Sequence, residues 1–99
     1  MNIEPFRELI EQRNQLAKVA VRNCAAEALA IVRSGNRDAH RIETCLDQML
    51  DFCFDAVMLR CFKKLCRYYF PIDPNAVAFY VHSYRQLWDD EQESTDVEN

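Results

Sequence analysis

The chain has 99 residues and a formal net charge of −4, and apolar residues make up 49% of it. This length corresponds to one domain. With only one glycine and three prolines, the sequence excludes the many tight turns of a strand-rich fold. We therefore expect an all-helical protein.

We expect neither a secretion signal nor a membrane span in this sequence. Its first residues, MNIEPFRELIEQR, are charged where a signal peptide is apolar, and no stretch approaches eighteen uncharged apolar residues. Five cysteines, an odd number with no CxxC pair, argue against a disulfide scaffold or a structural zinc site. We expect a cytoplasmic protein with buried, reduced thiols, which are Cys24, Cys45, Cys53, Cys61 and Cys66.

The charge is unevenly distributed. Residues 89–98 contribute six carboxylates and no Lys or Arg, so the remaining body carries +2. Residues 93–99 are polar and lack periodicity, which predicts a disordered acidic tail after a single helical domain at 1–92.

The first predicted helix spans about residues 5–33. Pro5 suits the first helical turn, and Gly35 suits the left-handed position after the last turn. Between them, apolar residues recur at spacings of three, four or seven. They are Ile3, Phe6, Ile10, Ala17, Ala20, Cys24, Ala28 and Ile31.

The second predicted helix spans about residues 38–69 and the third about 74–91. Asn36 or Asp38 is a candidate N-cap for the second helix, and Pro71 forces its end. Asp73 and Pro74 form a favourable start for the third. The first two helices form a long antiparallel hairpin, and the shorter third helix covers part of it.

The polar face of the second helix changes side along its length. Asp47, Asp51 and Asp55 share a face in the first half, whereas Lys63, Lys64 and their neighbours share a nearly opposite one in the second half. This reversal predicts either a kink near residues 56–59 or different packing partners for the two halves.

More apolar helical surface is present than three helices of one copy can cover, particularly at residues 17–32. A homodimer that completes a helical bundle is the simplest way to bury it. The expected dimer interface consists of Ala17, Ala20, Cys24, Ala28, Ile31, Met49 and Cys53.

A basic cluster on the second helix is the clearest candidate for contact with a partner or a phosphate. It consists of Arg60, Lys63, Lys64 and Arg67, followed by Tyr68 and Tyr69. Cations on one helical face can follow a nucleic-acid backbone, and tyrosines can stack on bases. A solvated helix end, favoured by the helix dipole, is the competing interpretation.

No catalytic or metal-binding pattern stands out. The acidic stripe Asp47, Asp51 and Asp55 lacks a histidine at ligand spacing, and His40 and His82 are expected at the surface. A single glycine excludes a glycine-rich phosphate loop. We therefore expect a protein without enzymatic activity, cofactor or metal.

Two functions remain open at this point. The first is a homodimeric helical protein–protein interaction or adaptor module. The alternative is a small nucleic-acid-associated regulatory protein that uses the basic cluster.

Overall fold

A computed structural model describes residues 3–88 and shows four α-helices. They are α1 (Glu4–Ser34), α2 (Ala39–Leu50), α3 (Ala56–Tyr69) and α4 (Pro74–Trp88). The all-helical prediction is confirmed for these residues. The expected acidic tail and the last turn of the predicted third helix lie outside the described residues.

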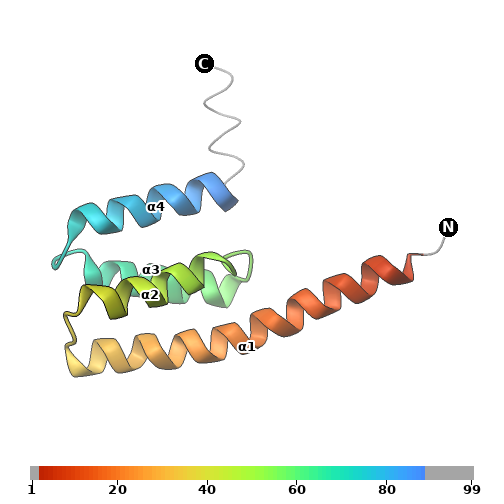
Figure 1. The fold of residues 1–99 in the computed structure, drawn as a ribbon, viewed down its shortest axis with the longest axis horizontal. Coiled ribbons are helices and arrows are strands. Elements are labelled where there is room, and N and C mark those ends of the chain that lie inside the picture. The colour runs from red at the N-terminus through yellow and green to blue at the C-terminus, as the bar shows by residue number, and fades with distance from the viewer. Residues whose placement is uncertain (1–2, 89–99) are drawn as a thin grey trace, which may run out of the picture.

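The helices form three layers (Figure 1). The second half of α1 is one outer layer, α2 and α3 lie side by side in the middle, and α4 covers them from the opposite side. The first half of α1 continues well beyond the other helices as an isolated rod. We call residues 3–16, all of which are exposed, the arm.

The predicted ends of α1 are correct because both depend on local chemistry. Pro5 lies in the first turn, where its missing N–H needs no partner. Gly35 ends the helix with φ +64°, and its N–H points at the carbonyls of Ile31 and Val32. The left-handed conformation that this ending requires suits glycine best.

The predicted single helix at 38–69 is wrong, because residues 51–55 separate α2 from α3. Asp55 has an extended backbone, and its carboxylate accepts hydrogen bonds from the N–H groups of Val57 and Met58 at 2.9 and 3.0 Å. A new N-cap therefore starts α3. The break resolves the reversal of the polar face, and it lies just before the residues where we expected a kink.

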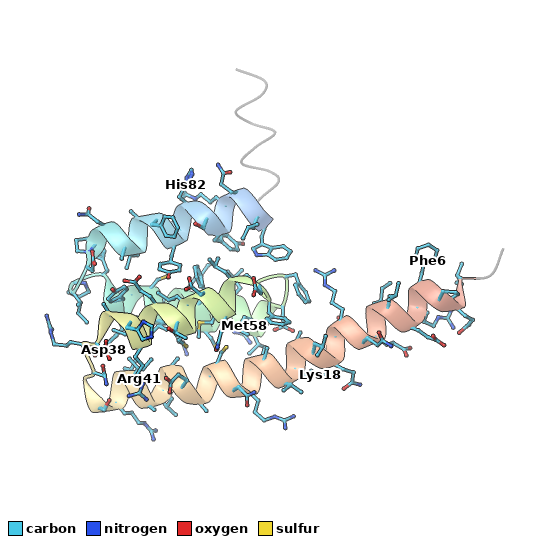
Figure 2. The ribbon with its side chains drawn as sticks, viewed as in Figure 1. Phe6, Lys18, Asp38, Arg41, Met58 and His82 are labelled. Atoms are coloured by element: carbon cyan, nitrogen blue, oxygen red, sulfur yellow. The ribbon has the colours of Figure 1, made fainter. Side chains whose placement is uncertain are left out.

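The core lies on both sides of the middle layer, where α2 and α3 pack against the second half of α1 and against α4, and the side chain of Met58 points into it (Figure 2). The largest fully buried side chains are Ile31, Ile42, Leu46, Met49, Met58, Leu65 and Tyr69. Their burial contributes most of the stability, at about 1.5–3 kcal/mol per large apolar side chain.

Polar contacts join the layers at their edges. Arg41 of α2 donates two hydrogen bonds, of 2.9 and 3.0 Å, to the carboxylate of Glu27 of α1. This pairing lowers the pKa of Glu27. The indole N–H of Trp88 donates a 2.8 Å hydrogen bond to the carbonyl of Leu50, at the end of α2. α4 thus satisfies a carbonyl that the helix end leaves without an intrahelical donor.

Candidate interaction site

The residues that we assigned to a dimer interface lie in the core of a single copy. Ala17, Cys24, Ile31, Met49 and Cys53 are at most 4% exposed, and Ala20 and Ala28 are packed against the same core. The apolar stripe of α1 meets α2 and α3 of its own chain. An interface between copies has to use other residues, and we correct the assignment accordingly.

The basic cluster is where the sequence placed it. Arg60, Lys63, Lys64 and Arg67 are exposed on the outer face of α3, and within residues 3–88 none of them forms an ion pair. We call these four residues the basic ridge. The two tyrosines that follow are not part of it. Tyr69 is fully buried, and the hydroxyl of Tyr68 donates a 2.7 Å hydrogen bond to the carbonyl of Asn36.

Two apolar grooves flank the basic ridge, and the sequence analysis missed both. The α1–α3 groove has a volume of about 390 Å³ and is lined by Ala25, Ala28, Leu29, Val32, Cys61, Lys64, Leu65 and Tyr68. The α3–α4 groove has a volume of about 360 Å³ and is lined by Phe62, Lys63, Cys66, Arg67, Phe70, Val77 and Val81. Each groove therefore has an apolar floor with at least one ridge cation at its edge.

The arm is amphipathic, although it packs against none of the other helices that the structure describes. At 100° per residue, its large apolar side chains share one broad face and its glutamates share another. The apolar residues are 53–68% exposed and are Ile3, Phe6, Leu9, Ile10 and Leu16. Figure 2 shows Phe6 near the free end of the helix, well beyond the other helices.

The arm contacts the rest of the described chain, residues 17–88, which we call the body, at Arg13. Its guanidinium group lies 3.7 Å from the centroid of the Phe54 ring, in the segment between α2 and α3. A cation over an aromatic face is attracted by the ring quadrupole. This contact defines where the arm leaves the body.

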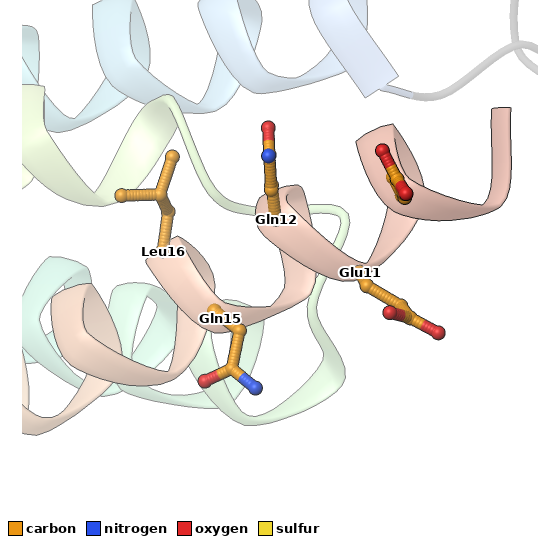
Figure 3. Close-up of a pocket in the computed structure, with 5 residues that line it drawn as sticks. Glu11, Gln12, Gln15 and Leu16 are labelled. Atoms are coloured by element: carbon orange, nitrogen blue, oxygen red, sulfur yellow. The ribbon is translucent and has the colours of Figure 1, made fainter. Parts of the chain in front are cut away.

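A hollow of about 560 Å³ on the arm is a poor candidate for a ligand site. Glu8, Glu11, Gln12, Gln15 and Leu16 line it, and all five come from α1. Figure 3 shows Leu16 and Gln12 on one side of the helix and Glu11 and Gln15 on the other. A small molecule held by one helix keeps most of its surface in water, whereas ligand pockets bury most of theirs.

The acidic stripe does not form a site. Asp47 accepts a 2.7 Å hydrogen bond from the Tyr80 hydroxyl, Asp51 ends α2, and Asp55 caps α3. Because the helix is interrupted at residues 51–55, the three carboxylates do not share one helical face. No group of three or more His, Cys, Asp or Glu side chains among residues 3–88 is arranged to hold a metal ion. His82 is exposed on α4, on the side away from α3 (Figure 2).

The buried cysteines are poorly suited to thiolate chemistry. Burial raises the pKa of Cys45 and of Cys53 to about 12, and that of Cys66 to about 11. Burial also raises the pKa of Cys24. The basic ridge lies on the same helix as Cys66, but desolvation of the thiolate dominates its pKa.

Two further results bear on the class of protein. No helix within residues 3–88 is long and apolar enough to cross a membrane. No family model, no curated protein and no solved structure matches the chain. Function therefore has to be argued from the arm, the ridge and the grooves.

Proposed function

We propose that this chain is a non-enzymatic helical interaction module that associates with a second copy of itself. The observation that carries the proposal is the exposed apolar face of the arm. Five large apolar side chains on a helix that no other part of residues 3–88 covers form the kind of patch that marks a protein–protein contact. The location that goes with this proposal is the cytosol, where thiols stay reduced.

The grooves beside the basic ridge support the same proposal. An apolar groove with cations on its rim fits an amphipathic helix whose polar side is acidic. Such a helix places its apolar residues on the floor of the groove and its carboxylates near the rim. The described part of the chain thus contains both a helix of this kind and grooves that suit one.

Light scattering after size-exclusion chromatography tests the proposal on the full chain. We expect a mass near twice the 11.7 kDa of one chain, falling towards the mass of one chain on dilution. Substitution of Phe6 by Asp removes the most exposed apolar side chain of the arm, and it should shift the protein to monomer without loss of helicity. A wild-type chain that stays monomeric at millimolar concentration overturns the proposal.

A nucleic-acid-associated role is the second candidate, and the basic ridge favours it, since its four cations form no ion pair with any described residue. Tyr69 is buried and the Tyr68 hydroxyl is bound to Asn36, so these two tyrosines do not supply the base stacking that we expected, and the support for this role comes from phosphate contacts. Binding of single-stranded or duplex DNA should then fall steeply with salt, and should fall again in Lys63→Glu. If no binding is detected at a salt concentration of about 20 mM, the nucleic-acid-associated role is excluded.

A further inference from the structure

We propose that the α1–α3 groove of each copy receives the arm of the other copy, so that two identical arm–groove contacts hold the dimer together. This inference rests on the proposed function and adds which surfaces meet. Both surfaces belong to α1: the arm is its first half, and Ala25, Leu29 and Val32 in its second half form one wall of the groove.

The arm cannot reach the groove of its own chain. α1 runs without interruption from Glu4 to Ser34, and Figure 1 shows the arm leading away from the other helices. A continuous helix cannot fold back on its own second half. An arm that occupies this groove must therefore belong to another copy of the chain.

The groove is suited to a helix. Ala25 and Ala28 are small, so a partner helix can approach α1 closely, and helix separations of 8–10 Å depend on the side chains at the contact. Leu29 and Val32 are 50% and 42% exposed, although they line an apolar surface. Phe6 and Ile10 of an incoming arm would cover them, and apolar area on both partners would leave water.

The charges of the two surfaces are complementary. The arm carries Glu4, Glu8 and Glu11 against Arg7 and Arg13, a net charge of −1. Lys64 lies in the groove lining, and Arg60 is exposed one turn earlier on the same helix. Opposite charges at the rim select the partner and its orientation more than they add affinity.

Symmetry explains why this groove is preferred over the α3–α4 groove. When two copies of α1 run antiparallel, the arm of each lies beside the second half of the other. The two contacts then form about one twofold axis, and the assembly closes as a dimer. The α3–α4 groove contains no residue of α1, so antiparallel pairing of α1 helices does not bring the arm to it.

Complementation between two variants tests the inference by sedimentation equilibrium of the full chain. Phe6→Asp damages the arm and leaves the groove intact, whereas Leu29→Asp damages the groove and leaves the arm intact. Both residues are exposed in a single copy, so each variant should keep its helicity. We expect each alone to weaken association at least about tenfold.

An equal mixture of the two variants should associate more tightly than either alone, because a heterodimer regains one of the two arm–groove contacts. Lys64→Glu should weaken association more than Lys63→Glu, since Lys63 lies at the other groove. Phe70→Asp, in the α3–α4 groove, should leave the dissociation constant of the dimer unchanged.

The possible failures are distinguishable. A monomeric wild-type chain overturns the proposed function together with this inference. A wild-type dimer that is weakened by Phe6→Asp and unaffected by Leu29→Asp overturns the inference alone, and an effect of Phe70→Asp then assigns the arm to the α3–α4 groove. A mixture that associates no better than the single variants also overturns the inference, because it indicates arm–arm pairing.

Discussion

The hydroxyl of Tyr80 in α4 donates a 2.7 Å hydrogen bond to the carboxylate of Asp47 in α2, 33 residues earlier in the chain. The Tyr80 ring is buried, whereas Asp47 lies at the surface. Tyr69 of α3 makes an analogous 2.5 Å bond to Glu43 of α2. Two carboxylates of α2 thus accept hydrogen bonds from tyrosine hydroxyls of α3 and α4, the two helices that pack on α2.

Removal of the Tyr80 hydroxyl should destabilise the fold modestly. We expect Tyr80→Phe to lower the free energy of unfolding by about 1 kcal/mol, because the exposed Asp47 carboxylate regains water when it loses its donor. Urea denaturation followed by circular dichroism measures this. In an Asp47→Asn background the effect of Tyr80→Phe should be smaller, and an equal effect in both backgrounds would show that the two side chains are not coupled.

The protein should lose stability at alkaline pH. Burial and the bonds to carboxylates raise the pKa values of Tyr69 and Tyr80, and burial raises the pKa of Cys66 to about 11 and those of Cys45 and Cys53 to about 12. A group whose pKa is raised by folding stabilises the fold fully below its unfolded pKa. That contribution is lost as the pH rises towards the folded pKa.

The loss should begin near pH 9, where thiols of the unfolded chain ionise, and continue through pH 11. Each group that ionises only in the unfolded chain adds a slope of about 1.4 kcal/mol per pH unit. Urea denaturation midpoints at pH 7.5, 9 and 10.5 measure this loss of stability. The stability of Tyr80→Phe should fall less steeply with pH above pH 10. A midpoint that is constant to pH 10.5 would contradict this account.

The N-cap of α3, Asp55, should stabilise the fold more than Asp51 at the end of α2 does. Asp55→Ala removes the acceptor of two backbone N–H groups, and it should lower the free energy of unfolding by about 1–2 kcal/mol. Asp51→Ala is the matched control, because within residues 3–88 the Asp51 side chain accepts no hydrogen bond. If both variants have the same thermal midpoint, the cap does not stabilise α3.

Gly35→Ala isolates the effect of backbone conformation. A Cβ built at Gly35 meets no atom within 4 Å, so only the left-handed φ of +64° opposes the substitution, at about 1–2 kcal/mol. Gly35→Asn should be less destabilising, since asparagine tolerates this conformation better. Thermal unfolding of the two variants gives the comparison, and a neutral Gly35→Ala would be inconsistent with the observed ending of α1.

The sequence by itself determined the features that depend on neighbouring residues. One glycine and three prolines predicted the helical class, Pro5 and Gly35 predicted the ends of α1, and Asp73 with Pro74 predicted the start of α4. The exposed cations of α3 were also predicted, because their spacing alone places them on one face. These signals are local, since caps and turns are made by residues within a few positions of each other.

Only the tertiary structure decided where the second helix breaks and which apolar faces remain uncovered. No glycine or proline marks residues 51–55. The break is held by distant contacts, with the Trp88 indole on the Leu50 carbonyl and Cys53 buried in the core. Likewise, periodicity shows that α1 has an apolar stripe from end to end. It does not show that α2 and α3 cover only the half from Ala17 onwards, because helix length and chain folding together determine which turns find a neighbour.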